Sequence, residues 1–150
     1  MTIASPPDFV TLEAIRAAAQ HLRGIAVHTP LLPVDELSER LGVPVFVKPE
    51  SLQRVGAFKL RGAFTLVRML AAEGTRGVIT YSSGNHGQAV AYAARRFGLR
   101  AVVVMPETAP ATKQRGVARW GGEVVLAGRT SGQSSTSSRP TVPCPVMIAG

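Results

Sequence analysis

The chain has 150 residues, of which 45% are hydrophobic, and its mean hydropathy is +0.16. This length and composition are sufficient for one globular domain with a hydrophobic core. The formal net charge is +8 at pH 7, but the basic residues are spread along the chain without a long block of like charges. This charge pattern disfavours a nucleic-acid partner.

Neither a secretory signal nor a membrane span can be recognised in the sequence. Asp8 and Glu13 interrupt the N-terminal segment, and no apolar run approaches the ~18 residues that a membrane-spanning helix requires. Cys144 is the only cysteine, which excludes an intrachain disulfide and a metal site built from several cysteines. We therefore expect a cytoplasmic protein without a membrane partner and without a metal site.

The sequence pattern of residues 1–50 predicts a helix followed by an extended arm. The helix can begin after Thr11, whose side chain is suited to an N-cap, and Pro30 and Pro33 favour extended backbone. A second, shorter helix ends at Gly42. The predicted elements are, in order, a helix over 12–22, extended backbone over 28–33, a helix over 35–41 and a strand over 45–47.

Residues 51–128 predict alternating helices and strands. The predicted elements are a helix over 58–70, strands over 78–81, 101–104 and 123–126, and helices over 86–97 and 110–120. Strands that alternate with helices in this way form parallel sheets joined by right-handed crossovers. The fold class is therefore α/β, with a doubly wound parallel sheet and a βαβαβ core, and ligands are expected at the carboxyl ends of the strands.

The composition changes after Gly128. Residues 129–145 are rich in Ser, Thr and Pro, contain no acidic residue and show no helical or alternating apolar period. We therefore expect residues 129–150 to form an irregular tail that is disordered or frame-disrupted.

Lys59 is the first candidate for chemistry. It is one of three lysines among seventeen basic residues, and it lies between glycines at the start of a predicted helix. An amine can lose its proton and attack a carbonyl, which a guanidinium cannot do. A solvated lysine at a helix start is the alternative, and this residue alone does not decide between the two.

The second candidate is the polar turn from Ser82 to Gln88, which follows a predicted strand and opens a predicted helix. Small residues let a ligand approach the backbone, and the N–H groups at a helix start can bind an anion such as a carboxylate. An ordinary capping turn is the alternative explanation for these residues.

Three ordered motifs carry a resemblance to a known family: F-K-x-R-G-A at 58–63, S-S-G-N-H-x-Q-A at 82–89 and V-x-M-P-E-x-A-P at 103–110. With them the chain resembles the threonine/serine dehydratase and serine racemase family, pyridoxal-phosphate enzymes of the tryptophan-synthase-β-like fold, fold type II. The resemblance extends from about Thr29 through Val125 and returns at 146–150, but it does not include the residues between Gly128 and Pro145.

The resemblance also implies that this chain contains only the N-terminal part of the family's fold. It further implies how the chain is divided between the two domains of such enzymes. Residues 1–50 would be a helix and strap that belong to the larger domain of such enzymes, and residues 51–128 would be their small α/β domain. The tail over 129–150 lies outside these two parts, and its residues 129–145 do not share the resemblance.

By resemblance, the cofactor is pyridoxal 5'-phosphate and the site residues have distinct roles. Lys59 would bind the cofactor covalently and then carry the Cα proton, and Ser83 would lie on the opposite face of the cofactor ring. Phe58 and Asn85 would contact the cofactor, Asn85 at the ring hydroxyl. The substrate's carboxylate would be bound by the loop Ser82, Ser83, Gly84, Asn85 and His86, in which no side-chain chemistry is assigned to His86.

The implied reaction is the deamination of L-threonine or L-serine, by α,β-elimination, to a 2-oxo acid and ammonia, with a homo-oligomeric full-length protein. A serine racemase, a non-catalytic remnant of the fold and a basic nucleotide-binding module are the alternatives. The glycine-rich loop that holds the cofactor phosphate in this family has no match in the sequence. We therefore expect these 150 residues to be an inactive fragment.

Overall fold

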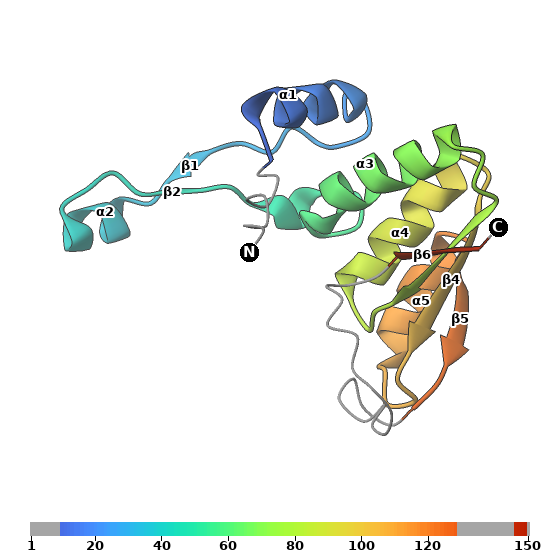
Figure 1. The fold of residues 1–150 in the computed structure, drawn as a ribbon. Helices are drawn as coiled ribbons and strands as arrows, with labels where there is room; N and C mark the ends of the chain where they lie inside the picture. Colours follow the sequence, from blue (N-terminus) through green and yellow to red (C-terminus); the bar gives the residue numbers. More distant parts are fainter. Residues whose placement is uncertain (1–9, 129–145, 150) are drawn as a thin grey trace, which may run out of the picture.

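The computed structural model describes residues 10–128 and 146–149, which form an α/β unit with a long arm (Figure 1). The elements are α1 (Leu12–His21), β1 (Leu32–Pro33), α2 (Asp35–Leu41), β2 (Phe46–Val47), the 3-10 helix η1 (Glu50–Leu52), α3 (Lys59–Ala72), β3 (Gly77–Tyr81), α4 (Asn85–Arg96), β4 (Arg100–Met105), α5 (Ala111–Arg119), β5 (Glu123–Leu126) and β6 (Val146–Ala149). The predicted helices and strands before Gly128 are all present, because their apolar periods and their caps agree.

The N-terminal part has the predicted order of elements. The Thr11 hydroxyl caps α1 by accepting from the backbone N–H of Ala14 at 3.2 Å, and Gly42 closes α2 with φ 67°. Strands β1 and β2 pair antiparallel, and together with α2 they form the arm that extends away from the α/β unit in Figure 1.

The main sheet has the strand order β5-β4-β3-β6. Strands β3, β4 and β5 run parallel, with α4 and α5 as the connections between them. The predicted parallel three-stranded core is therefore confirmed. Because the strands are parallel, the segments that follow β3 and β4 lie at the same edge of the sheet, where ligands bind in folds of this kind.

Strand β6 differs from the irregular ending that we expected for residues 129–150. Residues 146–149 pair antiparallel with β3, while residues 129–145 lie outside the described residues. Without this partner β3 would be an edge strand with unpaired backbone groups, so an apolar segment can be recruited there by backbone pairing alone. A pattern of four residues was too short to reveal the pairing.

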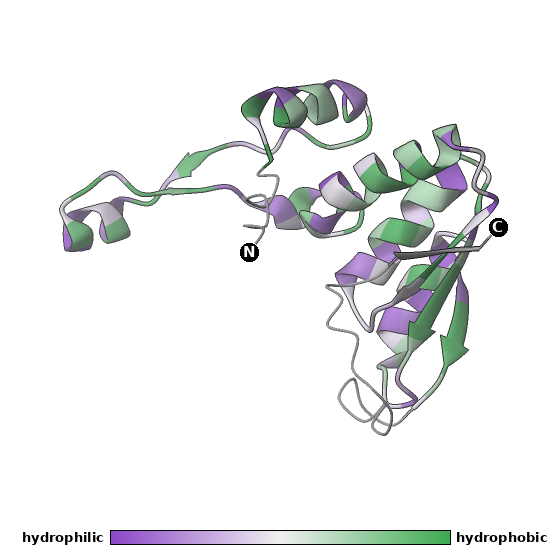
Figure 2. Cartoon of the chain, viewed as in Figure 1, coloured by the Kyte–Doolittle hydropathy of each residue, from purple (hydrophilic) through white to green (hydrophobic). Residues whose placement is uncertain are grey.

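Both crossover helices cover the same face of the sheet. Val103 and Met105 on β4 are fully buried, and α5 contributes the fully buried Val117 to the same core. On α4, Gly87 comes so close to the sheet that a Cβ atom there would lie 2.7 Å from Val103 Cγ1. Figure 2 shows β4 and β5 as hydrophobic along most of their length, which accounts for this packing.

Replacing Gly87 with alanine is expected to destabilise the protein by about 1–3 kcal/mol, because the added methyl group would overlap Val103 and crowd the Ser82 carbonyl oxygen at 3.3 Å. The matched control is Gly62→Ala on α3, where an added Cβ meets nothing within 4 Å and helix propensity favours alanine. Urea unfolding should show a lower midpoint for the first variant and an unchanged or higher one for the second. Equal midpoints would contradict the packing of α4 on β4.

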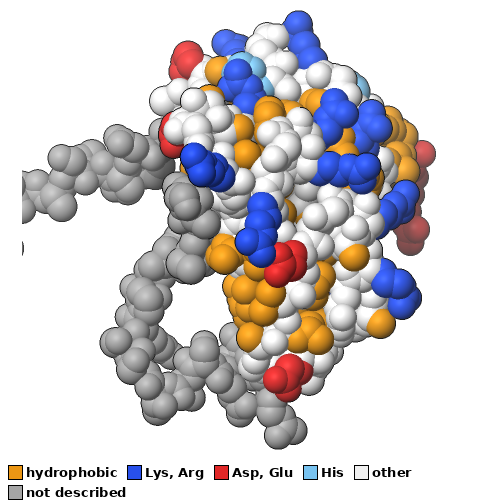
Figure 3. Space-filling model, turned by 90° about the vertical axis from the view of Figure 1, so that its right-hand side faces the viewer, with side chains coloured by type: hydrophobic (Ala, Val, Ile, Leu, Met, Phe, Trp, Pro, Cys, Tyr) orange, Lys and Arg blue, Asp and Glu red, His pale blue; other side chains and the backbone are white. Residues whose placement is uncertain are grey.

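The other face of the sheet carries no described helix. Ile79, Val102 and Val104 point to this face and are half-buried, and Val125 on β5 is exposed. Arg100 and Glu123 form an ion pair at 2.6 Å at the start of the same face. Figure 3 views the molecule from the β5 side and shows hydrophobic side chains gathered beside numerous basic ones. Among the described residues, no helix is long and apolar enough to cross a membrane.

Candidate active site around Lys59

Lys59 is the first residue of α3, and its side chain is exposed. The Nζ atom lies 4.9 Å from the centroid of the Phe58 ring, so the ammonium contacts the face of an aromatic ring. The helix begins here without a side-chain cap. The amine is therefore presented at the end of a rigid element and is accessible to a ligand.

The loop from Ser82 to Asn85 follows β3 at the carboxyl end of the sheet. The Ser82 hydroxyl accepts hydrogen bonds from the backbone N–H groups of Gly84 at 3.2 Å and Gly87 at 3.1 Å, and so it shapes the turn into α4. Ser83 is exposed, and Gly84 and Asn85 are half-buried. Within the predicted set, Ser82 thus builds the loop and Ser83 faces outward.

His86 connects the loop to Lys59. Its Nε2 atom is buried and has no hydrogen-bond partner among the described residues. Burial is the main cause that lowers the pKa of His86, and the positive charge of Lys59 lowers it further. The imidazole is therefore neutral at pH 7. Helix α3, which begins with Lys59, packs against α4.

Lys113 is a contact that the sequence interpretation missed. It lies in the first turn of α5, and its Nζ donates a hydrogen bond to Asn85 Oδ1 at 3.3 Å. Two weak signals in the sequence point to Lys113: lysine is rare in this chain, with three in all, and this lysine follows the motif that ends at Pro110. The helices α4 and α5 thus both begin at the candidate site.

A partly buried polar cluster fixes the backbone on both sides of Lys59, and its centre is the Glu50 carboxylate. Arg61 binds both oxygens of this carboxylate at 2.8 Å, and the Thr29 hydroxyl donates to it at 2.6 Å. These donors stabilise the ionised form, chiefly the guanidinium of Arg61, and lower the pKa of Glu50 from 4.5 to about 2. The carboxylate is therefore charged at any physiological pH.

The same cluster anchors the start of the arm. Gln53 is buried and exchanges hydrogen bonds with both backbone groups of Val27, at 2.9 and 2.8 Å. Lys48 Nζ donates to the carbonyl oxygen of Thr29 at 2.7 Å. Because Arg61 lies on the first turn of α3, the cluster links the arm to the helix that presents Lys59.

The residues at this site fit the aldehyde end of pyridoxal phosphate. The site offers an accessible amine at Lys59, and beside it the buried, unpartnered His86 Nε2 shows that a polar group at the loop lacks a partner. The start of α4 adds backbone donors that suit an anion. No group of three or more metal-binding side chains occurs among the described residues.

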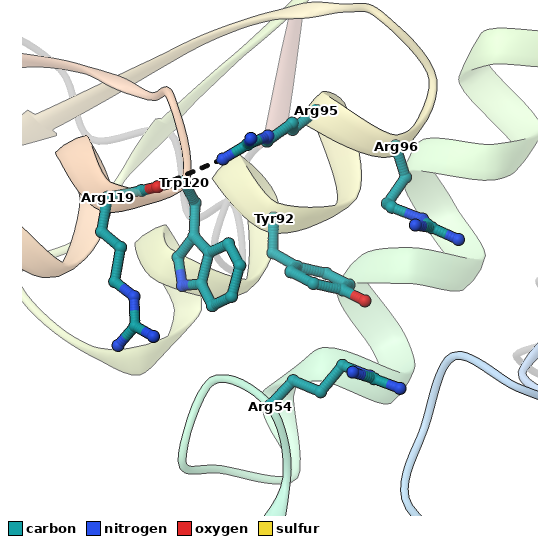
Figure 4. Close-up of a pocket in the computed structure, with 6 residues that line it drawn as sticks. All are labelled: Arg54, Tyr92, Arg95, Arg96, Arg119 and Trp120. Atoms are coloured by element: carbon teal, nitrogen blue, oxygen red, sulfur yellow. Dashed lines mark hydrogen bonds between the residues drawn. The ribbon is translucent and has the colours of Figure 1, made fainter.

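A separate cavity of about 500 Å³ is lined by two aromatic and four basic side chains (Figure 4). The lining residues are Arg54, Tyr92, Arg95, Arg96, Arg119 and Trp120. Arg119 stacks over the Trp120 ring at 5.3 Å. The cavity lies at the C-terminal ends of α4 and α5, whereas the Lys59 site lies at their N-terminal ends, so it does not belong to the predicted site.

The comparisons with known proteins agree with the motifs. The profile of the family described as pyridoxal-phosphate dependent enzyme matches residues 22–139. A biosynthetic L-threonine dehydratase of Pasteurella multocida is 50% identical over 105 residues, which cover 69% of this chain and 20% of that protein. An L-threo-3-hydroxyaspartate ammonia-lyase of a Pseudomonas species is 44% identical over 113 residues, covering 75% of this chain and 35% of that protein.

The fold is also shared with solved structures. The structure of maize serine racemase matches with a TM-score of 0.74 and 34% identity, over 82% of this chain and 38% of that chain. The chain thus spans between a fifth and about two fifths of the lengths of these relatives. The resemblance, the fold type II class and the cofactor expectation are confirmed at the level of the family. The chain therefore belongs to the family of pyridoxal-phosphate dependent enzymes.

Proposed function

We propose that this chain carries the lysine-bearing half of the active site of an ammonia-lyase that acts on L-threonine or L-serine. The observation that supports the proposal most directly is the exposed Lys59 amine at the start of α3, because this helix packs against α4, which begins at the predicted loop. The relatives named as threonine dehydratase and ammonia-lyase support the substrate class.

Each residue of the site has a role in this proposal. Lys59 would hold the cofactor through its aldehyde carbon, with loss of water. Its Nζ atom, freed when the substrate's amine takes its place, would accept the proton from the substrate's Cα. Phe58 packs beside the cofactor. When bound, the cofactor supplies the sink for the electrons of the Cα–H bond. The deamination then requires loss of the β-hydroxyl group as water.

The loop binds the substrate's carboxylate through backbone N–H groups from Ser83 to His86 and through the positive end of α4. Asn85 binds the ring hydroxyl of the cofactor. Because burial keeps His86 neutral, its side chain adds no charge to the loop. The attraction for the carboxylate must then come from backbone groups and from Lys113.

A racemase is the second candidate, supported by the serine racemase neighbour and by the exposed Ser83. In this reaction a proton carrier on the second face of the substrate returns the proton to Cα, and Ser83 would be that carrier. In a longer protein that includes this chain, Ser83→Ala should abolish exchange of the Cα proton from the D-amino acid while elimination from the L-amino acid remains. Absence of this exchange in the unsubstituted protein would favour the lyase alone.

The activity of this chain by itself is a further part of the proposal. The aligned residues make up 20% and 35% of two relatives, which are therefore about three and a half and about two times as long as this chain. We propose that these 150 residues hold the cofactor weakly and show no steady turnover. The positioned donors that a doubly charged phosphate needs would come from elsewhere in a longer protein. We likewise propose a cytoplasmic location and a homo-oligomeric full-length protein.

The test of the site uses the three lysines of the chain as mutual controls. Incubation with pyridoxal phosphate, reduction with borohydride and peptide mass analysis report how much of each lysine has reacted. We expect Lys59 to react several-fold faster than Lys48, whose Nζ is bound to a carbonyl oxygen, and faster than Lys113, which is bound to Asn85. Modification of Lys59 that is no faster than that of the other two would refute the assignment.

A further inference from the structure

In the hydrogen bond between Lys113 and Asn85, the lysine can only be the donor and the amide oxygen must be the acceptor. A lysine ammonium has three donors and no acceptor, so only the carbonyl oxygen of a side-chain amide can face it. Lys113 Nζ lies 3.3 Å from Asn85 Oδ1, and both residues are half-buried. The orientation of the Asn85 amide is thus determined by its partner.

This orientation leaves the NH₂ group of Asn85 for another partner. Asn85 is the first residue of α4 and follows the loop that begins at Ser82, so it lies beyond the carboxyl end of β3. Helix α3, which begins with Lys59, packs against α4. Without a cation at its oxygen, the amide could rotate and present either end to a ligand. The NH₂ group of Asn85 can donate reliably to a ligand only if the amide is held with its oxygen turned away from that ligand.

We propose that Lys113 is a positioning residue that fixes the Asn85 amide, so that its NH₂ group is available to donate to the phenolic oxygen of pyridoxal phosphate. The proposal rests on the function proposed above. Lys113 also polarises the amide, because a cation that binds the carbonyl oxygen draws electron density from the nitrogen and strengthens its N–H donors. The effect on the cofactor is transmitted through Asn85 and requires no contact with Lys113.

The elements packed around this contact support the assignment. The first residue of α3 is the basic Lys59, and the imidazole of His86 on α4 is kept neutral by burial. Among the described residues, the cation that donates to Asn85 Oδ1 is Lys113 on α5. The helix start at α5 therefore contributes a specific donor to the site on α4.

The chain offers a direct measurement, because Asn85 is its only asparagine. Labelling asparagine with ¹³C and ¹⁵N gives one side-chain carbonyl resonance and one NH₂ pair. In Lys113→Met the carbonyl resonance should move upfield and rotation about the C–N bond should become faster, because the cation no longer polarises the amide. Lys113→Arg, which also has donors only, should restore most of the effect.

The matched control is Lys48→Met, which removes a lysine bonded to the Thr29 carbonyl oxygen and should leave the Asn85 signals unchanged. Asn85 signals that are the same in the unsubstituted chain and in Lys113→Met would overturn the proposal. Urea unfolding would show whether Lys113→Met has unfolded. In that case the Asn85 signals of Lys113→Arg would be compared with those of the unsubstituted chain.

Addition of pyridoxal phosphate tests the functional part. Reaction at Lys59 should shift the NH₂ protons of Asn85, and Lys113→Met should lower the equilibrium extent of this reaction about tenfold, the loss expected for one hydrogen bond to a charged or polarised group. Reaction at Lys59 without a shift at Asn85 would overturn the positioning role. Absence of reaction at Lys59 would instead count against the proposed function, while the contact of Lys113 with Asn85 is still decided by the first measurement.

Discussion

Replacing Arg61 with methionine is expected to destabilise the protein by about 2–3 kcal/mol. The substitution keeps the length and the apolar stem of the side chain but leaves the Glu50 carboxylate, whose side chain is only 18% exposed, without its two bonds to the guanidinium. Breaking a buried ion pair from one side leaves an uncompensated charge, and the partial exposure of Arg61 moderates the cost. Urea unfolding monitored by circular dichroism gives the change.

The dependence on pH provides the second measurement of this cluster. The pKa of Glu50 is lowered from 4.5 to about 2 in the folded protein, so its stabilising effect is complete above pH 4.5 and is lost as the pH falls toward 2. A lowering of this size corresponds to an upper bound of about 3–4 kcal/mol, which solvent screening of the partly exposed pair reduces. Glu50→Gln should therefore have a lower free energy of unfolding at pH 7 than the unsubstituted protein. Its free energy of unfolding should also fall much less between pH 4.5 and 2.

Arg68→Met is the matched control, because it removes an arginine from the same helix that forms no ion pair among the described residues. It should change stability by less than about 0.5 kcal/mol. The double variant Glu50→Gln with Arg61→Met should be more stable than the sum of the single changes predicts, since the residues contact each other. Additive effects, or a control as damaging as Arg61→Met, would contradict the role of this ion pair.

The elements before Gly128 could be predicted from the sequence because each is specified locally. Thr11 caps a helix, Gly42 closes one with a positive φ, and the runs at 78–81 and 101–104 are apolar enough to be buried strands. In such segments the propensity, the caps and the apolar period agree, which makes the prediction secure. Strand β6 exists only through its pairing with β3 and has no local signal of this kind.

The candidate site was predictable only as far as its motifs reach. Lys59 and the loop after β3 were found from residue type and position, but the Lys113 contact with Asn85 joins residues that are 28 positions apart. Likewise the Glu50 cluster joins the arm to α3 through side chains whose partners no periodicity reveals. Polar contacts between elements depend on the tertiary fold, so a single sequence does not specify them.

The substitution of Lys59 is expected to have the largest chemical effect. Lys59→Met and Lys59→Arg should both abolish covalent attachment of pyridoxal phosphate at this position, because a thioether has no amine and a guanidinium does not lose its proton. Reduction with borohydride followed by peptide mass analysis should leave only slow modification of Lys48 and Lys113. Attachment to the peptide that contains residue 59 in either variant would contradict the proposed function.

The two variants differ in charge, and this difference tests the geometry of the site without the cofactor. The positive charge of Lys59 contributes to lowering the pKa of His86, after the larger effect of burial. Lys59→Met removes that charge, so the pKa of His86 should rise toward its ordinary value of 6.5 without reaching it, while Lys59→Arg should leave it low. Titration of the imidazole by NMR measures both. A pKa of His86 that is equal in the two variants would show that residue 59 is remote from α4, and the amine would then be too far from the loop to serve a substrate bound there.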